Sequence, residues 1–236
     1  VSKNGLVWTN LKSSEKSGIM LASVAYQESQ SKELSIALRP QKAIDFAIFY
    51  EQIHPYADGN QLLTVSTSTI TDNFGNTISD GTLVNFEVTT SEGKTLSAMA
   101  TTISGVATTS FLHPESASRW EIGAYIKGFA ESNTLQSEFK PAFTDFNVTV
   151  SKNNRRLQIE PIRSFMDQLI PDGMSIMWEI SNETGMNNKM SGSTRLGQGQ
   201  LNLDPGIYPY GNYEVSVTIG GINKFLNLNI TDDPLE

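Results

Sequence analysis

Apolar and polar residues alternate along several short stretches of the chain. Val84, Phe86 and Val88 are separated by polar residues, and the stretch 175–180 alternates in the same way around Trp178. A period of two places the apolar side chains on one face of a β-strand, with the central aromatic ring between two packed sheets. Because no stretch carries a sustained period of 3.6 residues with helix-capping signals, the pattern predicts an all-β chain.

Segments of this kind recur at intervals of 92 to 100 residues. The matched pairs are 45–50 and 145–150, 78–88 and 170–180, and 120–128 and 213–221. A weaker third copy of the last segment lies at 19–25. Self-similarity at a period near the length of a small domain predicts an array of like units. Four aromatic residues at matched positions are the predicted core residues, namely Phe86, Trp178, Trp120 and Tyr213.

The order of the repeated strands divides the chain into β-sandwich units joined end to end. Arg39-Pro40-Gln41 and Lys140-Pro141-Ala142 lie between units, and proline favours a stiff, extended connection. We therefore predict an elongated array. Its parts are a partial domain at 1–41 that holds only closing strands, a complete domain at 42–141, a divergent domain at 142–232 that is the candidate tip, and a tail at 233–236.

The composition narrows the range of partners and of chemistry. With a formal net charge of −8 and its Lys and Arg residues scattered singly, the chain offers no basic stripe for nucleic acid. No run approaches the roughly 20 apolar residues that span a bilayer, so we expect no membrane insertion within this chain. The absence of cysteine excludes disulfides and thiolate chemistry. We expect any export signal to lie outside these residues and more domains of the same protein to lie upstream.

The segment 63–88 carries a recognisable motif. It contains Thr71-Asp72-Asn73-Phe74-Gly75-Asn76 followed by Asp80-Gly81-Thr82, both flanked by alternating strands. Ala57-Asp58-Gly59 precedes it, and Gly105-Val106-Ala107 follows it. Together these residues resemble the group 1 bacterial immunoglobulin-like domain of intimins, invasins and related surface proteins.

The resemblance implies tandem immunoglobulin-like β-sandwiches in a bacterial protein that is extracellular or on the cell surface. It is much weaker in 142–232, where Met166-Asp167-Gln168-Leu169 replaces the expected Asp-x-x-Gly-Asn. Our leading hypothesis is a non-catalytic, rigid stalk that also serves as an adhesion or cell-contact module, with a protein or glycan on another cell surface as partner. Two alternatives are a decoration or spacer of a phage virion or appendage, and an accessory module of a secreted glycan-active enzyme.

Few side chains indicate catalysis or metal binding. His54 and His113 each precede a proline, and we interpret both as solvated loop residues, too few for a His-rich metal site. Without a Gly-x-Ser-x-Gly element they do not predict a nucleophilic enzyme, so we expect no catalytic residue, metal or cofactor. Oxygen ligands of the kind that Ca²⁺ accepts do cluster in one turn and at the joints, but turns of this composition form for backbone reasons alone. These residues are Asp72, Asn73, Asn76 and Asp80 in the turn, and Asp45 or Asp145 at a joint.

Two features of the last domain predict a contact site. Tyr208 and Tyr210 flank a proline, and exposed rings of this kind stack on sugars or fill an interface. Met186 and Met190 lie in a predicted loop at 182–195, and methionine adapts readily to a binding partner. The alternative for the methionines is that they fill the core of a divergent domain. We predict these four side chains as ligand-binding residues.

Overall fold

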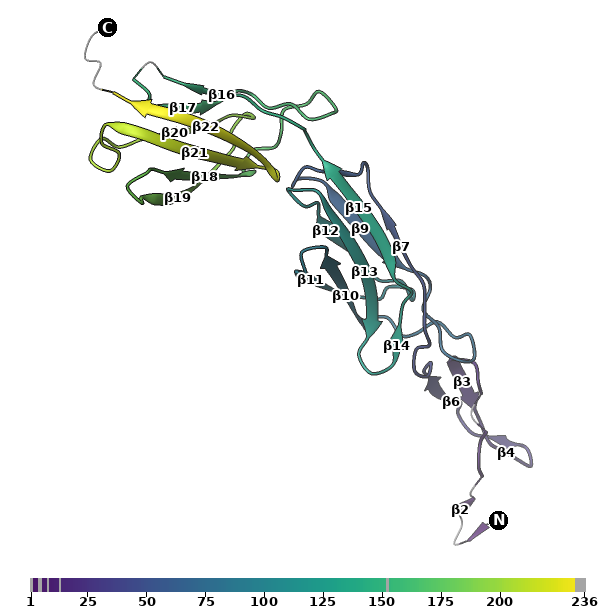
Figure 1. Cartoon of the computed structure of the whole chain (residues 1–236). Coiled ribbons are helices and arrows are strands. Elements are labelled where there is room, and N and C mark those ends of the chain that lie inside the picture. The colour runs from purple at the N-terminus through teal and green to yellow at the C-terminus, as the bar shows by residue number, and fades with distance from the viewer. Residues whose placement is uncertain (1, 4–5, 8, 13, 152, 232–236) are drawn as a thin grey trace.

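The computed structural model describes residues 2–3, 6–7, 9–12, 14–151 and 153–231. Every regular element in these residues is a β-strand, and none of them forms a helix that is long and apolar enough to cross a membrane. The strands build units that follow one another along an elongated molecule (Figure 1). The all-β architecture of tandem immunoglobulin-like sandwiches predicted from the sequence is therefore confirmed. Residues 232–236, with the predicted tail, lie outside the described residues.

The middle sandwich packs two sheets face to face. The larger sheet has the order β11 (Thr95–Thr101), β10 (Leu83–Thr90), β13 (Ser118–Ile126), β15 (Leu135–Pro141), β8 (Tyr56–Ala57), with β14 (Ala130–Glu131) paired to β13. The smaller sheet has the order β12 (Thr108–Leu112), β9 (Leu62–Thr67), β7 (Ile48–Glu51). Apolar side chains from both sheets meet between the layers, which explains the alternating pattern of the sequence.

The last sandwich repeats this strand order. One sheet runs β19 (Asn187–Ser193), β18 (Ser175–Ser181), β21 (Gly211–Ile219), β22 (Ile222–Ile230), and the other runs β16 (Val148–Val150), β17 (Arg156–Ile159), β20 (Gly199–Asn202). The register is repeated as well. Phe86 faces Ala124 across its sheet, and Trp178 faces Val217, which are the matched positions of the sequence repeat. The predicted duplication thus extends to individual residue pairs.

The predicted core residues lie between the layers. Phe86 and Trp120 are buried in the middle sandwich, and Trp178 and Tyr213 are buried in the last one. Each sandwich has its own cluster of buried apolar residues, and the two clusters have no buried member in common. The residue limits predicted for the domains stay a prediction.

The N-terminal strands form small two-stranded sheets. These are β1 (Ser2–Lys3) with β2 (Leu6–Val7), β3 (Gly18–Ala22) with β6 (Leu34–Leu38), and β4 (Ala25–Tyr26) with β5 (Ser29–Gln30). In β3, the alternation predicts a buried face, yet Ile19 is 75% exposed and Leu21 is 58% exposed. The reason is that no second sheet covers this face among the described residues.

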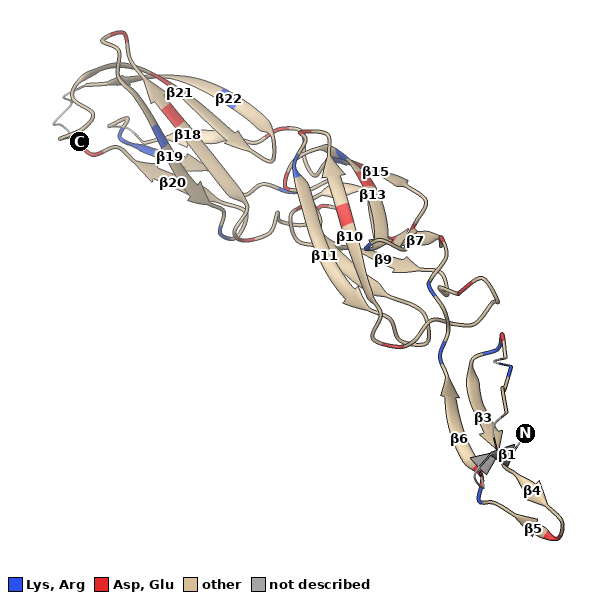
Figure 2. Ribbon diagram, turned by 90° about the horizontal axis from the view of Figure 1, so that it is seen from below, with Lys and Arg blue, Asp and Glu red and all other residues tan. Residues whose placement is uncertain are grey.

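Charged residues are dispersed over the described part of the chain. Figure 2 shows Lys and Arg interspersed with Asp and Glu along all the units. Oppositely charged side chains form a few exposed pairs, such as Lys189 with Glu179 at 3.3 Å, and such pairs contribute little to stability.

Candidate functional site

The far end of the last sandwich, away from the middle sandwich, is formed by three turns that include residues 153–155, 182–186 and 204–210. Asx turns shape all three, and in the first the Asn153 side-chain oxygen accepts a hydrogen bond from the Arg155 N–H (3.3 Å). The Asn182 side-chain oxygen accepts hydrogen bonds from the backbone N–H of Thr184 and Met186 (3.1 and 3.0 Å), and Asp204 accepts one from Gly206 (2.8 Å). These local bonds stabilise each turn from within. The predicted contact residues lie at or next to this end.

Tyr208 is not an exposed ring, so this part of the sequence prediction is wrong. Its side chain belongs to the core of the last sandwich and only 2% of the residue is exposed. The hydroxyl accepts a hydrogen bond from Asn188 (3.3 Å) and donates to the sulfur of Met190 (3.9 Å). The Tyr213 ring lies 5.9 Å away in an edge-on contact. Tyr208 therefore supports the turn from beneath.

Met186 and Met190 are also placed differently from the prediction. Both are half-buried and pack against the core of the last sandwich. Met190 is part of strand β19, and Met186 lies in the tight turn before it, so the predicted loop at 182–195 is a hairpin instead. The core-filling alternative describes these two methionines better than a free contact patch.

Tyr210 has the exposed ring that the sequence predicts. It is 60% exposed and follows directly on the buried Tyr208 turn. The Arg155 guanidinium lies 5.6 Å from the centre of the Tyr210 ring, and it also donates a hydrogen bond to the Tyr208 carbonyl oxygen (2.9 Å). Arg155 thereby joins the turn at 153–155 to the turn at 204–210 and orients the aromatic face.

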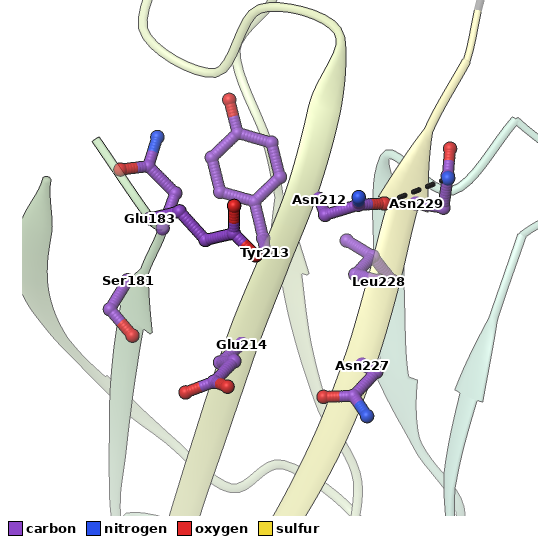
Figure 3. A pocket seen from close by; sticks show the side chains of 9 residues that line it. Ser181, Glu183, Asn212, Tyr213, Glu214, Asn227, Leu228 and Asn229 are labelled. Carbon is purple, nitrogen blue, oxygen red and sulfur yellow. Dashed lines mark hydrogen bonds between the residues drawn. The ribbon is translucent and has the colours of Figure 1, made fainter. Parts of the chain in front are cut away.

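A depression of about 520 Å³ opens beside this end of the sheet. Its floor crosses three neighbouring strands, where Ser181 of β18, Glu214 of β21 and Asn227 of β22 face one another in register. Figure 3 shows these side chains in a row below a second row, in which Asn229 donates a hydrogen bond to Asn212 (2.8 Å). The full lining is Ser181, Asn182, Glu183, Asn212, Tyr213, Glu214, Asn227, Leu228 and Asn229.

The chemistry of the depression is that of an open hydrogen-bonding surface. Carboxamides both donate and accept hydrogen bonds, carboxylates accept them, and hydroxyl-rich molecules match such a set. The sequence pattern does not single out these residues, because Asn212, Asn227 and Asn229 occupy the outward positions of two long strands. Outward Asn on a strand has no sequence signal that separates a binding residue from an ordinary solvated one. Only the pairing of β18, β21 and β22 brings them together.

The Asx-rich turn of the middle sandwich forms the joint with the N-terminal strands. Both oxygens of the Asp72 carboxylate are saturated by protein donors. One accepts from the backbone N–H of Phe74 and of Asn76 (both 2.9 Å), and the other accepts from Gln41 N–H (2.8 Å) and from the Asn76 side chain (2.9 Å). Burial alone raises the pKa of Asp72, but these hydrogen bonds outweigh it and hold the pKa well below its usual value.

Asn76 extends this joint to a second segment. Its side-chain oxygen accepts from Ser17 N–H (2.9 Å), and its side-chain nitrogen donates to the carbonyl oxygen of Glu15 (2.7 Å). The turn therefore binds two segments of the N-terminal part, the one that leads into β3 and the one that follows β6. The other aspartates weighed as ion ligands have protein partners too, since Asp80 accepts from Ser104 N–H (2.6 Å) and Asp145 pairs with Lys224 (2.9 Å).

A second joint connects the middle and last sandwiches. Glu115 accepts a hydrogen bond from Ser175 N–H at the start of β18 (2.9 Å). The Tyr56 and Phe165 rings stack at 5.5 Å between centres. At the β21–β22 turn, a Cβ on Gly220 would lie 3.3 Å from the Glu115 carbonyl oxygen, and its φ of +57° favours glycine. The close approach at this turn is visible in Figure 1.

The two histidines are not solvated, so their interpretation as exposed loop residues is wrong. They do lie in loops, His54 before β8 and His113 after β12. However, both loops fold into the end of the middle sandwich beneath the second joint, where 9% of the His54 side chain and none of the His113 side chain is exposed. Burial lowers the pKa of His113, while the Tyr56 carbonyl and the Asp58 carboxylate oppose the shift, so the ring is neutral at pH 7.

Solved structures of bacterial adhesins are among those to which the chain is similar. The Yersinia pseudotuberculosis adhesin InvE is 13% identical with a TM-score of 0.40, and the match covers 79% of this chain and 60% of that one. The Escherichia coli adhesin FdeC is 13% identical with a TM-score of 0.39, covering 91% and 74%. Invasin, described as a bacterial integrin-binding protein, is 14% identical with a TM-score of 0.37, covering 80% and 40%.

The intimin- and invasin-type domains that the motif at 63–88 resembles thus have counterparts among these structures. With TM-scores below 0.5 and identities below 15%, the similarities carry no argument about what the chain binds. No protein-family model and no curated protein sequence matches the chain.

Proposed function

We propose that this chain is a rigid, non-catalytic segment of a bacterial extracellular or cell-surface protein, and that its far end binds a glycan on another cell. The observation that carries the stalk role is the hydrogen bonding at the two joints. At each joint a carboxylate of the middle sandwich accepts a backbone N–H of the adjoining segment, Asp72 from Gln41 and Glu115 from Ser175.

Bonds of this kind favour a stalk over a flexible string of domains. The linkers contain Pro40 and Pro141, which restrict the backbone, and the side-chain bonds then fix the remaining rotation between neighbours. A rod that resists bending keeps its far end at a distance from its point of attachment. The exposed Ile19 and Leu21 of β3 further support the proposal that more of the same protein packs against the N-terminal strands.

The second joint provides a test of stiffness. The double variant Glu115→Ala, Phe165→Ala removes the bond to Ser175 and the ring stack on Tyr56. We expect small-angle X-ray scattering to give a rod-like distance distribution for the wild type. For the variant we expect a broader distribution with a shorter maximum dimension, because bent forms become populated.

A matched control is Glu138→Ala, Phe225→Ala, which removes an exposed glutamate and an exposed phenylalanine that make none of the joint contacts described above. It should scatter as the wild type does. Identical scattering by the joint variant and the control would show that these contacts do not set the stiffness, and the stalk role would lose its support.

The far end suits a glycan better than a protein. Asn212, Asn227, Asn229 and Glu214 offer donors and acceptors for sugar hydroxyls, and Tyr210 offers a ring face next to them. A protein interface usually centres on several apolar anchors, whereas this end exposes Tyr210 and Ile207 beside a depression lined mainly by polar groups.

Binding by this end can be measured on a glycan array and on cells, with the chain displayed in several copies to raise avidity. We expect Tyr210→Ala and Asn212→Ala each to weaken binding about tenfold or more, which corresponds to about 1.4 kcal/mol. Tyr26→Ala is the matched control, because Tyr26 is 75% exposed but lies in β4 among the N-terminal strands. Loss of binding in the Tyr26 variant alone, or no binding by the wild type, would reject the far end as the contact site.

A further inference from the structure

His54, Asp58 and His113 come together inside the middle sandwich. The His54 Nε2 atom lies 3.6 Å from one Asp58 oxygen, and the His113 Nδ1 atom lies 3.5 Å from the other. The two imidazole rings are 5.4 Å apart and nearly perpendicular. Each residue has one potential metal-ligand atom, a ring nitrogen or a carboxylate oxygen, that lies within 4.8 Å of those of the other two.

The cluster contains buried nitrogen atoms that no protein group satisfies. The Nε2 atoms of His54 and His113 are both buried and have no hydrogen-bond partner. His54 Nε2 points toward the Asp58 carboxylate but remains beyond hydrogen-bond length. Buried polar atoms nearly always have a partner, and a water molecule or an ion is the usual one when no protein group is near.

The backbone around the cluster holds its side chains in place. One Asp58 oxygen accepts hydrogen bonds from the N–H groups of Asn60 and Gln61 (both 3.1 Å), which fixes the carboxylate. Tyr56 orients both rings, because its N–H donates to His54 Nδ1 (3.2 Å) and its carbonyl oxygen lies 3.1 Å from His113 Nδ1. The bond from His113 Nδ1 to a backbone carbonyl is the kind that commonly orients a histidine for metal binding through its other nitrogen, here Nε2.

We propose that His54, Asp58 and His113 form a binding site for a divalent transition-metal ion, with Zn²⁺ as the best chemical match. Two imidazole nitrogens and one carboxylate oxygen are ligands that Zn²⁺ accepts, whereas Ca²⁺ and Mg²⁺ prefer sites made of oxygen. Bonds of about 2.0–2.1 Å in a tetrahedron place neighbouring ligands about 3.3–3.4 Å apart. The 3.6 Å separation between His54 Nε2 and Asp58 is within a small side-chain movement of that value. His113 binds either through its unpartnered Nε2 atom or through Nδ1, which lies 3.5 Å from Asp58 and would first have to give up its bond to the Tyr56 carbonyl oxygen.

Binding of the metal ion requires a change in the hydrogen bonds of the histidine rings. His54 Nδ1 accepts the Tyr56 N–H, so a ring proton is on Nε2, toward Asp58. The Tyr56 carbonyl oxygen accepts from His113, so a ring proton of His113 is on Nδ1. A metal bound at His54 Nε2 requires the proton there to move to Nδ1 or to leave, and the 3.2 Å bond to Tyr56 N–H is given up in exchange for a metal bond. We therefore expect an affinity below that of a fully formed structural zinc site.

The position of the site connects it to the second joint. The segment that carries His54 and Asp58 also carries Tyr56, whose ring stacks on Phe165 of the last sandwich. An ion held by His54, Asp58 and His113 ties this segment to the loop after β12. The same loop continues to Glu115, which binds Ser175. Metal binding thus restricts the movement of both segments that contact the last sandwich, through the Tyr56–Phe165 stack and the Glu115–Ser175 hydrogen bond.

The test uses the whole chain, stripped with a chelator and titrated with ZnCl₂ alone in a calorimeter. We expect one Zn²⁺ per chain, a higher Tm on saturation, and weakening by roughly 100-fold or more in His54→Gln. Because the chain has only two histidines, their ring signals in NMR spectra are readily assigned, and both should shift together up to one equivalent. Glu183→Gln, a carboxylate at the far end, is the matched control and should bind as the wild type does.

His54→Gln is the primary variant, because His113 contacts the Phe139 ring at 4.8 Å and its replacement can disturb the core. Circular dichroism checks that the variant is folded. Absence of binding by the wild type overturns the proposal. So does weak binding of several ions that His54→Gln leaves unchanged, since it would place Zn²⁺ on surface carboxylates. Neither result bears on the stalk or on glycan binding, which are measured separately.

Discussion

Trp178→Ala is expected to lower the free energy of unfolding of the last sandwich by about 3–5 kcal/mol and to leave the middle sandwich folded. Trp178 is 1% exposed and lies on the central strand β18, between β19 and β21. Removing its ring leaves a cavity that the surrounding strands cannot fill. Since a domain of this size is stable by only about 5–15 kcal/mol, the loss is a large fraction of the total.

Phe86→Ala is the matched change in the other sandwich. Phe86 occupies the equivalent position on β10 and is fully buried. Differential scanning calorimetry should resolve two unfolding transitions, one for each sandwich. Phe86→Ala should lower the Tm of the middle sandwich only, and Trp178→Ala that of the last sandwich only. A variant that lowers both transitions equally would show that the two sandwiches unfold as one unit, against the separate cores seen in the structure.

Asp72→Ala is expected to release the N-terminal strands from the middle sandwich and to lower the Tm of that sandwich by at least about 5 °C. The substitution deprives four donors of their acceptor, among them Gln41 N–H in the linker and the Asn76 side chain. Hydrogen exchange should become faster at Gln41 and at Ser17, which Asn76 holds. Asn73→Ala, at the exposed neighbouring position, is the control and should change neither quantity.

The contribution of Asp72 should also depend on pH in a definite direction. Its pKa in the folded chain is lower than the value of about 3.9 expected when unfolded. The stabilisation is therefore fully present above about pH 4 and is lost as the pH falls further toward the folded pKa. We expect the Tm difference between wild type and Asp72→Asn to be constant from pH 7 to about pH 4.5 and to shrink below pH 4. A difference that shrinks at neutral pH instead would assign the effect to another group.

Much of the fold could be predicted from local sequence. The alternation around Phe86 and Trp178 is a direct consequence of strand geometry, so it reports which side chains are buried without knowledge of the partner strands. The turn at Asp72 was predicted for the same local reason. Its role as a joint was not, because the bonds from Gln41 and Ser17 connect residues that are distant in the sequence.

The candidate sites depended much more on the tertiary structure. Tyr208 and Tyr210 look alike in the sequence, yet one is buried against Tyr213 and the other is exposed beside Arg155. His54 and His113 are 59 positions apart, and their places between the repeated strands predict solvated loops. Nothing in their immediate neighbours indicates that the two loops fold inward at the same end of the sandwich.

The amino-acid pattern alone is enough to predict duplicated, two-layered β units in an end-to-end array, because burial of alternate residues on a strand is a local property repeated along the chain. Which polar side chains meet depends on the three-dimensional packing. The Asp72 joint, the Asn-lined depression and the His54, Asp58 and His113 cluster all join segments that are brought close by sheet pairing and loop packing. Distances of this kind follow from the packing of whole layers, and no short stretch of sequence encodes them.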